Sequence, residues 1–277
     1  MPDPRHQARA ATLRQLHDRR SILLLPNAWD AGTAALCARH GFPAIGTTSG
    51  GLAWALGYPD GEQAPLREVL AVVARMVRAV DVPVTVDLET GYGDESAAVA
   101  ESVRALLTTG AAGLNLEDGM PGHGPLRRIE EAAARIAAAR AAANEAGIAL
   151  VINARVDHWM QEQSDPAAPL ADAIARARAY LAAGADCIYP IGLRDTDTLR
   201  RFIQAIDAPV NVAAGAGMPP LPELAMLGVA RVSTATRLST IALDAVDRAL
   251  RTMRETGSFE SLASQFTYAD AQALFES

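Results

Sequence analysis

The sequence contains no lysine, and all 25 of its basic residues are arginines. A Schiff-base aldolase, a pyridoxal-phosphate enzyme and a P-loop nucleotidase each depend on a lysine amine, so these three classes are excluded. Cysteine is also scarce. Cys37 and Cys187 lie far apart in the chain and match neither a disulfide framework nor a zinc-binding pattern. Their apolar neighbours predict two buried thiols.

Long hydrophobic runs are missing as well. The chain has no stretch of about 18 apolar residues, the length that could span a membrane. Residues 1–20 are polar and rich in arginine, without the apolar segment of a signal peptide. We therefore expect a cytoplasmic protein with no membrane partner. The net charge of −7, with acidic residues dispersed along the chain, also disfavours a nucleic-acid partner.

A simple unit repeats along the chain: an amphipathic helix, usually a glycine that ends it, and a strand of four or five apolar residues. Eight such units in about 250 residues predict an α/β fold, the (β/α)8 barrel of the TIM type, because parallel strands need helical crossovers of one hand and eight can close. A doubly wound open sheet is the alternative. The expected strands occupy residues 21–25, 41–45, 81–84, 110–116, 147–152, 184–189, 207–210 and 228–232.

The whole chain, residues 1–277, is expected to form one domain. Residues 1–20 contain a short leading helix, and apolar residues at helical spacing predict buried stripes over 66–80 and 99–107. Beyond the last unit, residues 254–277 form a helical extension with enough apolar side chains to require a partner surface, such as that of a neighbouring subunit. These side chains are Phe259, Leu262, Phe266, Tyr268, Leu274 and Phe275.

Residues 84–94 combine an apolar strand with an acidic end. Side chains alternate along a strand, so the carboxylates of Asp87 and Glu89, at i and i+2, are expected to point the same way. Two adjacent carboxylates repel one another unless a proton or a cation neutralises them. Two glycines follow, and Asp94 is expected to cap the N-terminus of the next helix.

Polar residues also follow the other strands, at the end of a barrel where active sites form. Glu117 follows the strand next to that of Asp87 and Glu89, and these three carboxylates predict a shared Mg²⁺ or Mn²⁺ site. Taken singly, each acid could be only a turn former or a helix cap. Arg155 either forms an interior ion pair with one of these acids or binds the carboxylate of an anionic substrate.

Three other segments carry candidate binding residues. Ser49, Gly50 and Gly51, expected in a loop, offer backbone N–H groups that can approach an oxyanion closely. Trp29 is either a pocket wall or a core residue. His123 lies in a loop rich in glycine and proline after the fourth strand. We interpret this loop as a mobile lid, although an exposed histidine without a role has the same pattern.

Eight short motifs follow one another along the chain: Pro-Asn-Ala-Trp-Asp at 26–30, Thr-Ser-Gly-Gly at 48–51, Leu-Gly-Tyr-Pro-Asp at 56–60, Val-Asp-Leu-Glu-Thr-Gly-Tyr-Gly at 86–93, Leu-Glu-Asp at 116–118, Asn-Ala-Arg-Val-Asp at 153–157, Ala-Ala-Gly-Ala-Asp at 182–186 and Pro-Val-Asn-Val at 209–212. Together they resemble the isocitrate lyase/phosphoenolpyruvate mutase superfamily. The resemblance implies a (β/α)8 barrel that binds Mg²⁺ and 2-oxo carboxylates or their enolates. It also implies a homo-oligomer, a dimer or typically a tetramer in which the last helix is exchanged between subunits.

The resemblance also implies a role for each matching residue. Asp87 is the direct metal ligand, Glu89 stands where the family usually has Asp, and Glu117 and Asp60 hold the metal or its waters. The carboxylate and enolate oxygens of the substrate are bound by Ser49, Gly50 and Gly51. Arg155 binds the substrate carboxylate, and Asn211 matches a further polar position.

The loop after the fourth strand departs from the family pattern. The carbon–carbon lyases carry a catalytic cysteine there, and the mutase branch an asparagine and a lysine. Here the loop reads Met-Pro-Gly-His-Gly at 120–124, with none of the three. A family glutamate after the sixth strand is Ile191 in this chain. The half of the site that stabilises an enolate is therefore recognisable, whereas the half that selects the reaction is not.

From these residues and this resemblance we predict a Mg²⁺-dependent, or Mn²⁺-dependent, carbon–carbon lyase. Its substrate is a small 2-oxo acid, or a precursor that releases one, and the reaction is C–C cleavage or decarboxylation through an enolate held by the metal. His123 or a water would donate the proton. The alternatives are carbon–phosphorus bond chemistry on phosphonopyruvate and a 2-oxo acid binding protein without turnover.

Overall fold

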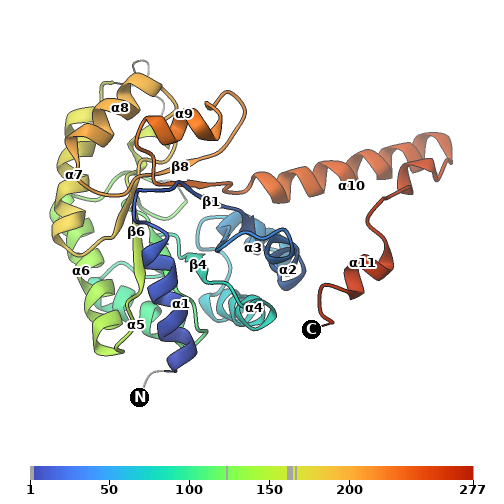
Figure 1. The fold of residues 1–277 in the computed structure, drawn as a ribbon, viewed down its shortest axis with the longest axis horizontal. Helices are drawn as coiled ribbons and strands as arrows, with labels where there is room; N and C mark the ends of the chain where they lie inside the picture. Colours follow the sequence, from blue (N-terminus) through green and yellow to red (C-terminus); the bar gives the residue numbers. More distant parts are fainter. Residues whose placement is uncertain (1–2, 123, 161–164, 166, 277) are drawn as a thin grey trace.

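The computed structural model describes residues 3–122, 124–160, 165 and 167–276, which alternate between parallel strands and helices (Figure 1). The helices surround the strands, and the last long helix projects away from them. The α-helices are α1 Pro4–Gln15, α2 Ala31–Arg39, α3 Ser49–Leu56, α4 Leu66–Ala79, α5 Ser96–Leu107, α6 Ile129–Glu145, α7 Leu170–Ala182, α8 Thr196–Ala205, α9 Leu221–Met226, α10 Arg237–Thr256 and α11 Tyr268–Gln272, with short 3-10 helices η1 Asp157–Met160 and η2 Glu260–Leu262.

The strands follow the order of a closed barrel. β2 to β7 pair in chain order as one parallel sheet, and β8, β9 and β1 pair as a second. A bridge between Ile188 and Val210 links β7 to β8, and Pro26 alone separates β1 from β2, so the order returns to its first strand. The strands are β1 Leu23–Leu25, β2 Asn27–Ala28, β3 Ile45–Thr47, β4 Val84–Asp87, β5 Gly113–Leu116, β6 Val151–Arg155, β7 Cys187–Tyr189, β8 Asn211–Ala213 and β9 Arg231–Ser233.

Alternation along the strands gives the barrel a polar interior and an apolar outer face. The outward residues of β4 and β5, Val86 and Leu114 among them, are fully buried beneath the helices. The inward residues reach across the axis: Arg231 of β9 donates to Oδ1 of Asn115 on β5 at 3.3 Å. The same alternation directs Asp87 toward the interior, where its Oδ1 lies 3.5 Å from Nδ2 of Asn115.

The predicted helix stripes are confirmed, since Val69, Val73 and Met76 of α4 and Val99 and Val103 of α5 are buried. Both cysteines are buried as well. The leading helix is shorter than residues 1–20, because α1 ends at Gln15 and the chain turns through Arg19 at a φ of +64°.

Helix α10 extends away from the barrel, and the chain returns through η2 and α11 (Figure 1). The extension expected over residues 254–277 therefore comprises the end of α10, η2 and α11, and the projecting segment already begins at Arg237. Ile241, Leu243, Val246 and Leu250 on α10 are each between 55% and 61% exposed. Among the described helices, none has the length and apolar composition needed to cross a membrane.

Gly113 offers a test of how α1 packs against the strands, because Leu13 of α1 lies directly against it. A Cβ at Gly113 would lie 2.8 Å from Cδ2 of Leu13 and 2.9 Å from the carbonyl oxygen of Val151. We expect Gly113→Ala to lower the free energy of unfolding by about 1–3 kcal/mol through overpacking, measured by chemical denaturation. Gly215→Ala is the control, since its Cβ would meet nothing closer than 3.6 Å. Equal stabilities of the two variants would contradict this packing.

Candidate active site

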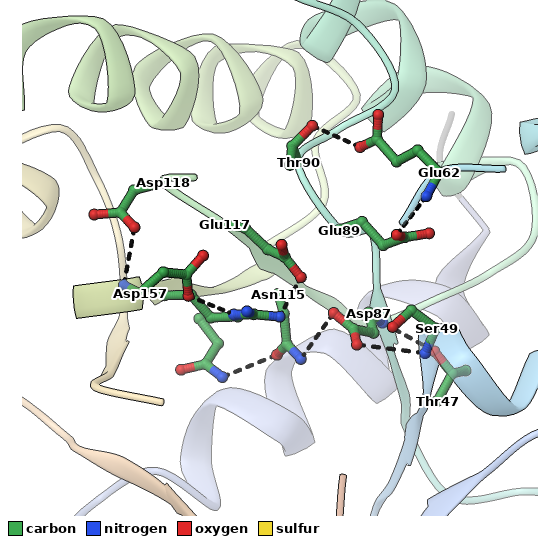
Figure 2. A network of polar contacts seen from close by, with 12 residues as sticks. Thr47, Ser49, Glu62, Asp87, Glu89, Thr90, Asn115, Glu117, Asp118 and Asp157 are labelled. Atoms are coloured by element: carbon green, nitrogen blue, oxygen red, sulfur yellow. Dashed lines mark hydrogen bonds and ion pairs between the residues drawn. The ribbon is translucent and has the colours of Figure 1, made fainter. Parts of the chain in front are cut away.

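Asp87 ends β4 at the carboxyl end of the barrel and is held there by its backbone. Its N–H donates to Oγ1 of Thr47 at 2.9 Å. Among the described residues, by contrast, its carboxylate makes only long contacts: Oδ2 lies 3.4 Å from the N–H of Ser49, and Oδ1 lies 3.5 Å from Nδ2 of Asn115 (Figure 2). Because hydrogen bonds at these distances are weak, the Asp87 oxygens remain available to a stronger partner.

Ser49, Gly50 and Gly51 form the first turn of α3, which corrects the expectation that they lie in a loop. The hydroxyl of Thr48 caps this turn by accepting from the N–H of Gly51 at 3.4 Å. The first N–H groups of a helix have no partner within it and carry a partial positive charge, so this turn can still bind an anion.

Glycine is required in this turn because neighbouring side chains approach the backbone closely. A Cβ at Gly51 would lie 2.7 Å from Cγ2 of Thr48 and 2.9 Å from Cβ of Trp29. A Cβ at Gly50 would lie 3.1 Å from Oδ2 of Asp60. Asp60 is thereby placed beside the start of α3, and its Oδ1 is buried without a hydrogen-bond partner among the described residues.

Glu89 lies on a turn beyond β4, at a φ of +52°, so the alternation expected for a strand does not apply to it. Its Oε2 accepts from the N–H of Glu62 at 2.6 Å (Figure 2). Its Oε1 accepts from the hydroxyl of Tyr92 at 3.2 Å. Burial, followed by the nearby charges of Asp87 and Asp60, raises the pKa of Glu89 to about 7. The carboxylates therefore repel one another, as the sequence predicted.

Asp94 does not cap the next helix, so this expectation was wrong. Glu95 occupies the N-cap position of α5, without a side-chain hydrogen bond to the helix. The carboxylate of Asp94 instead lies 3.2 Å from Nη2 of Arg127, at the end of the loop that follows β5. The chain between Glu89 and α5 is thus directed by a contact to a segment distant in sequence.

Glu117 and Arg155 are brought together at the ends of β5 and β6. The N–H of Glu117 donates to the carbonyl oxygen of Glu89 at 2.8 Å, which places the two acids side by side. Nη1 of Arg155 pairs with Oε1 of Glu117, and Nε of Arg155 lies 2.9 Å from Oδ1 of Asp157. Arg155 is therefore an interior ion-pair partner, but its buried Nη2 has no partner among the described residues.

Charge around this ion pair is unbalanced. Burial raises the pKa of Glu117 well above its ordinary value, although Arg155 opposes the effect, and Asp157 adds to it. Burial alone would lower the pKa of Arg155, but Asp157 and Glu117 together raise it. The guanidinium therefore stays charged, while the carboxylates around it outnumber it.

Three of the predicted residues lie apart from this group or outside the described residues. Trp29 lines an apolar pocket of about 210 Å³ with Gly51, Ser239 and residues of α10. Asn211 is fully buried in the barrel, where its Nδ2 donates to Oγ of Ser233 at 3.2 Å. His123 falls outside the described residues, so its predicted role remains a prediction.

Sequence reasoning missed several polar residues that shape the site. Oδ1 of Asn115 accepts from Nδ2 of Asn153 at 2.9 Å, which turns the other end of the Asn115 amide toward Asp87. Alternation along residues 113–116 would have placed Asn115 on the inner face. Glu62, which accepts from Oγ1 of Thr90 at 2.7 Å, comes from a loop with no local signal.

The residues present fit a divalent cation. Buried carboxylates with raised pKa values, weakly held oxygens on Asp87 and the unpartnered Oδ1 of Asp60 all indicate missing positive charge. Within the described residues, however, no three His, Cys, Asp or Glu side chains are close enough to ligate one ion directly. Mg²⁺ commonly uses one or two carboxylates and several waters. Asp87 therefore suits direct ligation, and Glu89 and Glu117 would act through water.

Fold and site together define a (β/α)8 barrel with an acidic site beside Arg155, whose Nη2 has no partner among the described residues. The sequence pattern of the family described as phosphoenolpyruvate phosphomutase matches residues 13–254. The chain belongs to this family, within the isocitrate lyase/phosphoenolpyruvate mutase superfamily. The predicted superfamily and barrel are thus confirmed.

Relatives of named function are similar over much of the chain. An oxaloacetate decarboxylase of Paraburkholderia xenovorans is 31% identical over 255 residues, which is 87% of this chain and 81% of that protein. The 2-methylisocitrate lyase of Escherichia coli is 34% identical over 189 residues, so the match spans 65% of this chain and only 61% of the lyase. These relatives confirm the prediction of a lyase-type enzyme.

A solved structure from Burkholderia cenocepacia J2315, assigned provisionally as a lyase/mutase, superposes with a TM-score of 0.91. It is 37% identical and covers 99% of this chain and 98% of that one. The similarity therefore extends beyond the barrel to the projecting C-terminal segment.

The raised pKa of Glu89 makes the stability of the metal-free protein depend on pH. The folded pKa of about 7 exceeds the ordinary 4.5, so protonation stabilises the fold below pH 4.5 and this contribution is lost as the pH rises to 7. We expect the wild type to lose at most about 3 kcal/mol of unfolding free energy between pH 4.5 and pH 7. Glu89→Gln should abolish this loss, as measured by thermal unfolding in the presence of a chelator. Glu101→Gln, an exposed acid on α5, is the control, and unchanged pH dependence in Glu89→Gln would refute the shift.

Proposed function

We propose that the chain is a divalent-metal-dependent lyase that acts on a small 2-oxo carboxylic acid, or on a precursor that releases one, by C–C cleavage or decarboxylation. The observation that carries this proposal is that excess negative charge and an unpartnered hydrogen-bond donor lie together at the ends of β4 to β6. Carboxylates are in surplus around Asp87, and Nη2 of Arg155 has no partner among the described residues. A metal would balance the negative charge, and an anionic substrate would accept from Nη2.

Arg155 is suited to bind the substrate carboxylate. Its side chain is only 4% exposed, and Glu117 and Asp157 fix two of its three nitrogens, so Nη2 has a defined direction. A guanidinium never loses its charge in water and is weakly hydrated, which favours carboxylate binding at a buried position. The N–H groups of Ser49, Gly50 and Gly51 at the start of α3, of which Ser49 and Gly51 make only long contacts of 3.4 Å among the described residues, would donate to a second substrate oxygen, aided by the helix dipole.

Lyases of this superfamily typically use a divalent metal. In this chain Asp87 would hold the ion directly, and Glu89, Glu117 and Asp60 would hold its waters; Mg²⁺ or Mn²⁺ matches these hard oxygen ligands. When bound, the metal supplies the positive charge that stabilises a developing enolate oxygen. A lysine would do this as an iminium in other enzymes, and this sequence has none.

The oxaloacetate decarboxylase relative favours decarboxylation of a 2-oxo acid over the alternatives. Carbon–phosphorus chemistry on phosphonopyruvate is disfavoured because the asparagine and lysine of the mutase loop are absent. His123 or a water remains the proposed proton donor. A 2-oxo acid binding protein without turnover is the other alternative.

The first test is calorimetric titration with oxalate, a planar mimic of pyruvate enolate, with and without Mg²⁺. We expect binding that requires the metal and is lost in Asp87→Asn, because the substitution removes the charge of the predicted direct ligand without changing its size. Asp81→Asn is the control, an exposed acid at the other end of β4. Metal-independent binding, or equal binding by the two variants, would contradict the metal role of Asp87.

We also propose that the chain assembles with copies of itself through α10. Its exposed apolar residues Val246 and Leu250 lie on one face, opposite Asp244 and Arg248, which pair with each other. Both side chains are more than half exposed, on a helix that projects from the barrel (Figure 1), and such an apolar face is typical of an interface.

A substitution on this face tests the assembly. We expect the wild type to have the mass of a dimer or tetramer by light scattering after gel filtration. Val246→Asp combined with Leu250→Asp should reduce this to the monomer, since burying two charges at an interface is costly. Arg248→Asp, on the charged face, should assemble normally. A monomeric wild type would refute the proposal.

A further inference from the structure

A buried polar cluster lies behind the candidate site, between β5 and the outer helix α7. Its centre is Asp118, which is 2% exposed and follows Glu117 directly. Oδ2 of Asp118 accepts from the hydroxyl of Tyr180 at 2.7 Å and from Nη1 of Arg176 at 3.2 Å. Its Oδ1 accepts from the N–H of Asp157 at 2.9 Å (Figure 2). One carboxylate thus joins α7 to the segment after β6.

The contacts continue from this segment to the arginine of the site. Oδ1 of Asp157 accepts from Nε of Arg155 at 2.9 Å, and Glu117 accepts from Nη1. Asp118 therefore does not touch Arg155. It fixes the backbone of the residue whose carboxylate holds Arg155, and so determines where the free Nη2 points.

The cluster is held from several sides. Nε of Arg176 donates to Oδ2 of Asp172 at 2.8 Å, and its Nη1 also donates to the carbonyl oxygen of Arg127 at 2.9 Å. The N–H of Arg127 in turn donates to the carbonyl oxygen of Asp118 at 2.9 Å. Buried charges with this many partners have little freedom to move, because every displacement leaves a polar group unsatisfied.

We propose that Asp118, together with Tyr180 and Arg176, is a positioning unit that orients Arg155 toward the carboxylate of the substrate. The proposal rests on the proposed function, in which Arg155 binds that carboxylate. Among the described residues, the cluster makes no hydrogen bond or ion pair with Asp87 or Asp60. Its loss should therefore weaken the binding of an anion and spare the binding of the metal.

The test compares two equilibria in the same variant. Mn²⁺ affinity is measured by electron paramagnetic resonance without ligand, and oxalate affinity by calorimetry at saturating Mn²⁺. We expect Asp118→Asn to weaken oxalate binding about tenfold, by analogy with the lower end of the effect of partners that orient metal-binding side chains. Its Mn²⁺ affinity should stay at the wild-type value. A general loss of folding would instead reduce both.

The chain offers a matched control at the opposite end of β6. Asp186 also accepts from a backbone N–H, that of Ile152 at 2.8 Å, and pairs with an arginine of an outer helix, Arg140, at 2.6 Å. Asp186→Asn removes a partly buried carboxylate that has the same two kinds of partner, a backbone N–H and an arginine, but no contact that leads to Arg155. It should lower the melting temperature and leave both affinities unchanged. Equal oxalate affinities of the Asp118 and Asp186 variants would overturn the proposal.

If Asp118→Asn does not fold, Tyr180→Phe removes one donor to Asp118 without changing the packing. We expect this variant to weaken oxalate binding about threefold, with Mn²⁺ affinity unchanged, because one of several partners is lost. Unchanged oxalate affinity would overturn the proposal. A wild type that binds Mn²⁺ but not oxalate would refute the proposed function itself, and so separates that failure from failure of the positioning role.

Discussion

The repulsion among buried carboxylates at the carboxyl end of the barrel is the constraint on which the candidate site depends. Burial raises the pKa of both Glu89 and Glu117, nearby carboxylates including Asp87 raise them further, and Arg155 is the guanidinium that pairs with Glu117 and Asp157. Burial makes this imbalance costly, because charges in a weakly polar interior interact strongly. The chain tolerates it where a cation and an anionic ligand would restore the balance, which is typical of a functional site.

The scaffold makes this concentration of charge sustainable. Short parallel strands place their ends at one edge, and the outward residues supply an apolar layer under the helices that stabilises the barrel independently of the site. Polar groups inside the barrel are joined by contacts such as those of Asn115 with Asn153 and Arg231. Stability and chemistry therefore come from different faces of the same strands.

The absence of lysine gives the site its particular chemistry. Arginine keeps its charge at any ordinary pH and presents several donors in a fixed plane, so it can be held on two sides and still offer a third nitrogen. Arg155 has this arrangement, between Glu117 and Asp157. In the proposed function, electrostatic stabilisation would take the place of covalent activation of a carbonyl, and it requires rigid positioning of each charge.

The repeat of helix, glycine and apolar strand was sufficient to predict the barrel, because periodicity and strand-entry signals are local properties of the chain. It also placed Asp87, Glu117 and Arg155 at neighbouring strand ends. Where the local conformation depended on distant contacts, the sequence misled: Asp94 pairs with Arg127 instead of capping α5, and Ser49 to Gly51 begin a helix. The free Nη2 of Arg155 and the link from Asp118 to Asp157 join residues from separate elements. Only the tertiary structure decides such contacts, since they depend on how the ends of several strands and α7 meet in space.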